Sequence, residues 1–148
     1  MTLAYIGLGS NLGDREETIR RAVELLGAAR VSTLIETEPW GYADQPRFLN
    51  AVVELETDEP PRALLDRLLE IERELGRTRE GPRYGPRTID LDLLLYGDDR
   101  LDEPGLRLPH PRLHERAFVL EPLAELAPEL LVPGFGAVKA LLSRLQSG

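Results

Sequence analysis

The chain has 148 residues, 42% of them hydrophobic and 30% charged, and its 26 acidic residues against 18 lysines and arginines give a formal charge of −8. That length predicts a single domain, residues 1–148. The excess of acidic residues argues against a nucleic-acid surface. The absence of cysteine excludes disulfides and thiolate metal sites. The longest uncharged stretch, residues 1–13, is too short for a membrane span and lacks a basic leader, so we expect a cytoplasmic protein without membrane contact.

The hydrophobic pattern predicts the order strand, helix, strand, strand, helix, strand. Asp14 with Glu17 three residues later is typical of a helix start, and Pro60-Pro61 begins a second apolar helical face that Gly76 ends. The expected strands are 2–8, 31–37, 48–56 and 88–96. One expected helix starts at 14 and ends near 27–30, another covers about 61–75, and a final helix lies around 138–145. A short hairpin is expected at 100–108, and a short segment of unassigned type at about 117–127.

This order of elements is the split βαβ arrangement of a ferredoxin-like sheet. We therefore expect an α/β (α+β) fold with a mainly antiparallel sheet flanked by helices. The Gly- and Pro-rich segments 38–46 and 77–87 lack apolar periodicity and are predicted to be long loops.

Two carboxylates stand out inside an otherwise apolar strand. Asp90 and Asp92 are two residues apart, so their side chains share one face about 6.6 Å apart along the strand, while Leu91 and Leu93 take the other face. Two close anions repel unless a cation lies between them, and oxygen ligands of this kind suit Mg²⁺. The alternative is a pair of solvated acids on an edge strand.

Basic residues concentrate near this pair in an otherwise acidic chain. The loop before the strand contains little opposing charge of its own, which suits a polyphosphate bridged by Mg²⁺. Its arginines could instead pair with acids elsewhere on the surface. His110, fixed between two prolines and near Arg116, could donate to a phosphate, although a lone loop histidine is more often structural. The arginines of the loop are Arg77, Arg79, Arg83 and Arg87.

Other residues admit both a ligand role and a packing role. Phe48 and Asn50 share a strand face, and with Phe118 they offer the aromatic rings and carboxamide that a flat heterocycle needs, although core packing is the commoner use. The glycines of GLGSNLG, residues 7–13, follow a strand as in dinucleotide-binding turns, but the spacing is one residue too long. We therefore interpret them as allowing a turn and close packing, with a backbone role next to a ligand as the alternative.

Four motifs together resemble one known family. They are YIGLGSNL at 5–12, DQPRFLN at 44–50, RYGPRTIDLDLL at 83–94 and LPHPRLHERAF at 108–118. In order and spacing they are similar to those of the 6-hydroxymethyl-7,8-dihydropterin pyrophosphokinases of folate biosynthesis, and the resemblance runs from about residue 3 to 145.

The resemblance implies a ferredoxin-like fold and transfer of pyrophosphate from ATP to the pterin hydroxymethyl group, giving AMP. No obligate protein partner is evident from the sequence. The resemblance also implies two Mg²⁺ ions at Asp90 and Asp92, which would be catalytic together with Arg77 and Arg87. ATP would contact Glu72, Arg77, Arg79, Tyr84, Arg87, His110 and Arg116. The pterin would lie between Phe48 and Phe118, with its edge read by Asn50 and the backbone near Thr37 and Trp40.

Two alternative functions, neither of them the pyrophosphokinase reaction, remain open. A regulatory ferredoxin-like domain that binds a small ligand would leave Asp90, Asp92 and the arginines unexplained. A dinucleotide-binding module built on the N-terminal glycines would need a parallel sheet and a longer chain. In any of these readings, no side chain stands out as a general base.

Overall fold

A computed structural model describes residues 1–11, 13–37, 47–76 and 89–147 of the chain. The elements are β1 (Thr2–Ser10), α1 (Arg15–Leu26), β2 (Arg30–Val31), β3 (Ile35–Thr37), β4 (Phe48–Thr57), α2 (Pro61–Glu74), β5 (Asp90–Tyr96), β6 (Leu101–Glu103), β7 (Leu106–Leu108), the 3-10 turn η1 (Leu113–Glu115), α3 (Ala117–Leu126), β8 (Leu131–Val132), β9 (Gly136–Ala137) and α4 (Val138–Ser147).

The main sheet has the strand order β2-β4-β1-β5, with β3 also paired to β4. Its four described pairings are all antiparallel, and β1 lies between β4 and β5. When β2 and β3 are counted as one broken strand, this is the predicted ferredoxin-like order. The parallel sheet that a dinucleotide-binding module requires is not formed by the described residues, so that reading is wrong.

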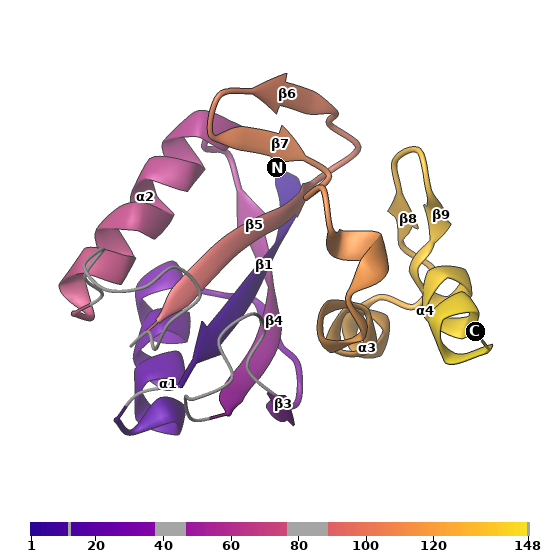
Figure 1. Cartoon of the computed structure of the whole chain (residues 1–148). Coiled ribbons are helices and arrows are strands. Elements are labelled where there is room, and N and C mark those ends of the chain that lie inside the picture. The colour runs from indigo at the N-terminus through magenta and orange to yellow at the C-terminus, as the bar shows by residue number, and fades with distance from the viewer. Residues whose placement is uncertain (12, 38–46, 77–88, 148) are drawn as a thin grey trace.

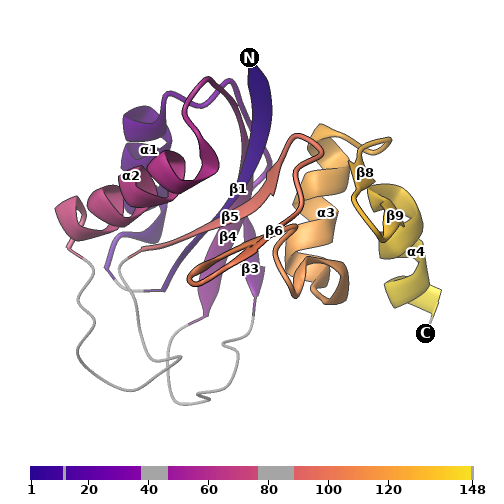
Figure 2. The ribbon, with the colours of Figure 1, turned by 90° about the horizontal axis from the view of Figure 1, so that it is seen from above.

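Helices cover the two faces of the sheet unequally (Figures 1 and 2). On one face, α1 and α2 pack on inward side chains such as Ile6 and Val53, both fully buried. On the other, α3 packs on Tyr5 and Val52, and α4 lies outside α3. Because α3 covers only part of this second face, the ends of β1, β4 and β5 leave room there for a pocket.

The predicted boundaries are confirmed in most places. Asp14 caps α1 by accepting a hydrogen bond from the Glu17 backbone N–H, and Gly76 follows α2 with a φ of +92°, which favours glycine. The hairpin β6–β7 and the helix α4 also lie where they were predicted, and the short segment expected at 117–127 is the helix α3. No helix in the described part of the chain is both long and apolar enough to cross a membrane.

Two predicted boundaries are wrong. The strand expected over 31–37 is broken, because the Ser32 hydroxyl accepts the Val52 N–H at 2.9 Å in place of a backbone carbonyl. Strand β1 continues to Ser10, two residues further than predicted, so Gly9 belongs to the central strand instead of to a turn.

Truncating Leu123 should test how firmly α3 is held against the sheet. Leu123 is fully buried in the hydrophobic core between α3 and the sheet, so Leu123→Ala should lower the free energy of unfolding by about 2–5 kcal/mol in urea titrations. Leu131→Ala is the matched control, since that side chain is 63% exposed and its loss should cost less than about 0.5 kcal/mol. Equal losses in the two variants would contradict this packing.

Candidate active site

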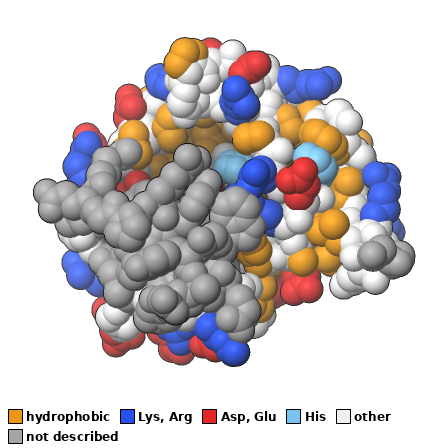
Figure 3. Space-filling model, viewed as in Figure 1, with side chains coloured by type: hydrophobic (Ala, Val, Ile, Leu, Met, Phe, Trp, Pro, Cys, Tyr) orange, Lys and Arg blue, Asp and Glu red, His pale blue; other side chains and the backbone are white. Residues whose placement is uncertain are grey.

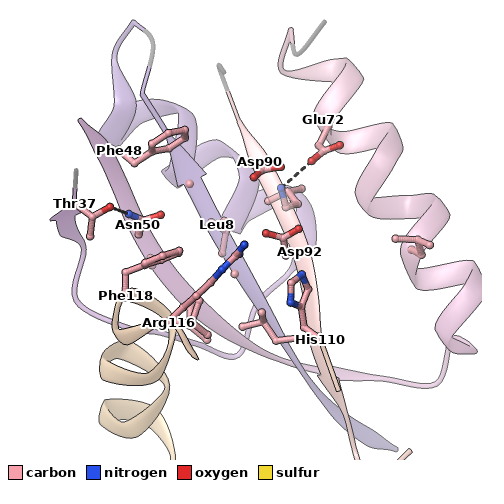
Figure 4. A pocket seen from close by; sticks show the side chains of 18 of the residues that line it. Leu8, Thr37, Phe48, Asn50, Glu72, Asp90, Asp92, His110, Arg116 and Phe118 are labelled. Carbon is pink, nitrogen blue, oxygen red and sulfur yellow. Dashed lines mark hydrogen bonds between the residues drawn. The ribbon is translucent and has the colours of Figure 1, made fainter. Parts of the chain in front are cut away.

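A pocket of about 430 Å³ opens where β1 ends and β4 and β5 begin. It is lined by residues of β1, β3, β4, α2, β5 and α3 together with His110 and Arg116 (Figure 4). Its size lies within the range of small-molecule sites. On the face shown in Figure 3, basic and acidic side chains are interspersed around the described part of the surface.

The floor of the pocket is the glycine backbone of β1. Gly9 lies between Asn50 and Asp90, and Gly7 lies opposite Asp92 in the next row of the same face. A Cβ atom added at Gly9 would lie 3.0 Å from Asn50 Oδ1 and 3.5 Å from a ring carbon of Phe48. The glycines therefore keep the space between β4 and β5 clear of side chains, which fits the alternative of a backbone role next to a ligand better than the expected turn.

Asp90 and Asp92 enter the pocket from the N-terminal end of β5, and both are half-buried. As their spacing predicts, the two carboxylates lie on the same face and point into the cavity (Figure 4). Among the described residues, no three His, Cys, Asp or Glu side chains lie close enough together to hold a metal ion by themselves. A pair of carboxylates alone fits Mg²⁺, which usually completes its octahedron with water and substrate phosphates.

Glu72 lines the same pocket from α2, and only 3% of the residue is exposed. Its Oε2 accepts a hydrogen bond of 2.8 Å from the backbone N–H of Leu91, between the two aspartates (Figure 4). Because β5 is an edge strand of the described sheet, this N–H faces no further strand among the described residues, and Glu72 satisfies it. A buried carboxylate thus fixes the strand that presents Asp90 and Asp92.

His110 is held beside β5 by its own backbone, whose N–H donates to Leu94 O at 2.9 Å. The imidazole Nδ1 accepts from the Arg112 backbone N–H at 3.3 Å, which leaves the proton of the neutral ring on Nε2. Burial, reinforced by the positive charges of Arg116 and Arg112 against the opposing effect of Asp90, lowers the pKa of His110 to about 4. At neutral pH the ring is therefore an uncharged hydrogen-bond donor.

The other end of the pocket is aromatic. Phe48 of β4 and Phe118 of α3 lie on either side of Asn50 in Figure 4. Asn50 donates through Nδ2 to the Thr37 hydroxyl at 2.5 Å, so its carbonyl oxygen faces Gly9 and the cavity. The guanidinium of Arg116 lies over the Phe118 ring, 5.5 Å from its centre.

The structure thus brings most of the predicted site residues into one pocket. Those lining it are Thr37, Phe48, Asn50, Glu72, Asp90, Asp92, His110, Arg116 and Phe118. The remaining predicted residues, Trp40, Arg77, Arg79, Tyr84 and Arg87, lie outside the described part of the chain.

Several lining residues were not among the predicted site residues. Gly7 and Gly9 were given a ligand-side backbone role only as an alternative, although they repeat with the same two-residue period as Asp90 and Asp92. Leu65 and Leu69 of α2 also line the pocket, but nothing in their helical pattern separates them from core residues.

A family model described as 7,8-dihydro-6-hydroxymethylpterin-pyrophosphokinase (HPPK) matches residues 5–128. The chain belongs to this family. It is 50% identical over 134 residues to the 2-amino-4-hydroxy-6-hydroxymethyldihydropteridine pyrophosphokinase of Bacillus subtilis, a match that covers 86% of the chain and 80% of the relative. It is 47% identical to the enzyme of that name from Methylorubrum extorquens, over 100% of the chain and 97% of the relative. The resemblance found in the sequence is thereby confirmed.

Among solved structures, the chain is similar to Plasmodium falciparum HPPK-DHPS, with a TM-score of 0.79 at 14% identity. The match covers 99% of this chain but only 46% of that longer chain. At this identity the likeness supports the HPPK fold alone.

The titration of His110 should test the electrostatics of the pocket. In the ligand-free, metal-free chain, proton NMR should give His110 a midpoint well below the ordinary 6.5, near 4, and His110→Gln identifies its signal. Because the folded-state pKa is lowered, the neutral ring stabilises the fold above pH 6.5, and this contribution is lost as the pH falls toward 4. His110→Gln should lose less stability than the wild type over that interval, and a midpoint at or above 6.5 would contradict the burial.

Proposed function

We propose that this pocket is the site in which ATP and 6-hydroxymethyl-7,8-dihydropterin react. Membership of the family makes the chain a pyrophosphokinase of folate biosynthesis, a transferase that uses ATP. The observation that carries the assignment of the site is that one pocket has two chemically different ends, separated by the glycine backbone of β1. An aromatic and carboxamide end faces a carboxylate end, with Gly7 and Gly9 between them.

The aromatic end suits the pterin. A flat ring inserted between Phe48 and Phe118 would stack on both faces, and comparable stacks are worth about 1–3 kcal/mol per base. The Asn50 carbonyl oxygen, oriented by the bond from its amide nitrogen to Thr37, would accept a hydrogen bond from the ring edge. The backbone near Trp40 would complete the recognition of that edge.

The other end suits the triphosphate. His110 would donate through Nε2, and Arg116 would supply positive charge to the phosphate oxygens. Arg77, Arg79, Tyr84, Arg87 and Glu72 are proposed to complete the nucleotide site. We propose two Mg²⁺ ions at Asp90 and Asp92, because the all-oxygen donor pair fits this ion. When bound, the metal would neutralise charge on the phosphate oxygens.

The reaction needs positioning more than covalent help from the protein. The pterin hydroxymethyl oxygen forms a bond to the β-phosphorus, and the bond from that phosphorus to the α,β-bridging oxygen breaks, so that AMP leaves with the bridging oxygen. The hydroxyl proton passes to water. With a pKa near 4, His110 is a poor acceptor for it and is better suited to donating. Stacking and carboxamide contacts would hold the attacking oxygen in line.

Residues 1–148 are proposed to act as one pyrophosphokinase domain in the cytoplasm, with ATP and the pterin as binding partners and no obligate protein partner. The pocket supports this, since its described lining comes from elements throughout the chain, from β1 to α3.

Replacing Asp90 and Asp92 by Asn should test the carboxylate end. The change keeps the shape but removes the charges, so AMP formation should fall by several orders of magnitude, with partial recovery in excess Mg²⁺. Phosphorus NMR should show AMP and a pyrophosphorylated pterin from the wild type. Asp98→Asn, an exposed residue just beyond β5, is the control and should keep full activity. ADP as the main product, or full activity in the double variant, would refute the mechanism.

Phe118→Ala should test the aromatic end. Loss of one stacking face should weaken pterin binding by about tenfold or more, while ATP binding changes little. Calorimetry with a non-hydrolysable ATP analogue measures both affinities. Phe135→Ala, which removes a ring that is 41% exposed and does not line the pocket, should leave both unchanged. An equal loss of both ligands in Phe118→Ala would indicate a packing role instead.

A further inference from the structure

Three charged residues form a cluster that joins separate segments of the chain beside the aromatic end of the pocket. Arg15, the first residue of α1, donates through Nη2 to Glu36 Oε2 at 2.9 Å and through Nη1 to the backbone oxygen of Arg47 at 2.9 Å. Arg47 Nη1 also lies 3.4 Å from Glu36 Oε1. Both oxygens of one carboxylate therefore connect β3, the start of β4 and the start of α1. We call these residues the Glu36 cluster.

The Glu36 cluster lies one residue away from two proposed pterin contacts. Glu36 precedes Thr37, and Arg47 precedes Phe48, while Thr37 and Phe48 are direct partners in the β3–β4 ladder. Because side chains alternate along a strand, Glu36 points away from the pocket face that Thr37 occupies. Its register partner Leu49 belongs to the core on the helix side, where α1 lies. The Glu36 cluster thus restrains the backbone of β3 and β4 on the sheet face opposite the pocket.

Strand β3 needs such a restraint. It is only three residues long and, in the described sheet, it pairs with β4 alone. Few backbone hydrogen bonds fix so short an edge strand, yet its last residue, Thr37, orients the Asn50 carboxamide. Hydrogen bonding from Arg15 lowers the pKa of Glu36, which keeps its carboxylate ionised and bonded at neutral pH.

We infer that Glu36 is a positioning residue for substrate specificity, fixing β3 against β4 through Arg15 and Arg47 so that Thr37 and Asn50 meet the edge of the pterin. This inference rests on the proposed function, because it takes the pterin as the ligand of the aromatic end. Exposed ion pairs add little to global stability. The effect of the cluster should therefore appear in pterin affinity and in the environment of Asn50, with melting temperature nearly unchanged.

Glu36→Gln tests this, with Glu103→Gln as a matched control. Glu103 forms a comparably exposed pair with Arg62 at 3.0 Å, away from the pocket lining. Calorimetry should measure the pterin alcohol in the presence of α,β-methylene-ATP, and that analogue alone. We expect Glu36→Gln to weaken pterin binding roughly three- to tenfold and analogue binding less than about twofold. Glu103→Gln should change neither, and the two variants should melt within about 2 °C of each other.

A second readout needs no substrate. In the ligand-free chain, the NMR signals of the Asn50 side-chain amide should shift in Glu36→Gln and stay in place in Glu103→Gln. Unchanged pterin affinity, unchanged Asn50 signals, or equal weakening of both ligands would each overturn the inference. If the wild type itself fails to bind the pterin alcohol, the proposed function fails. If the wild type binds and Glu36→Gln binds equally well, only the positioning role fails.

Discussion

The register of β1 against its two neighbours is the constraint on which the site depends. Gly9 of β1 is paired with Asn50 of β4 on one side and with Asp90 of β5 on the other. Two residues earlier, on the same face of the sheet, Gly7 is paired in the same way with Val52 and Asp92. A slip of one residue would turn the glycines toward α1 and α2 and place large side chains of β1 in the pocket. The apolar face of β1, including the fully buried Ile6, prevents that slip because it must pack under the helices. The hydrophobic core thus fixes the relative positions of the polar site residues.

Residues with local periodicity could be placed from the sequence. The orientation of Asp90 and Asp92, the caps of α1 and the order of the elements all follow from spacings of two to four residues, and these predictions are confirmed. The resemblance of four motifs also identified the family. The period-two glycines carried the same kind of signal, but their turn-like composition favoured the wrong reading of Gly9.

Contacts between distant segments could not be predicted in this way. The bond from Leu91 to Glu72 joins residues 19 apart, and nothing in the pattern of α2 distinguishes this glutamate from a solvated one. The neutral state of His110 depends on burial and on nearby charges that only the folded chain assembles. The break at Ser32 likewise results from a side chain bonding to Val52 across the sheet. Each of these depends on tertiary geometry, which overrides local preference.

The glycine floor also affects how the pocket could evolve under an inhibitor. A compound that rests on Gly7 and Gly9 touches no side chain of these two residues that a point mutation could shrink or recharge. The remaining change at Gly9 is to add a side chain, whose first carbon would already lie 3.0 Å from the Asn50 carbonyl oxygen and close to Phe48. A substitution at Gly9 that blocks an inhibitor would therefore also disturb the groups proposed to recognise the substrate. Resistance at this position should come with a loss of activity.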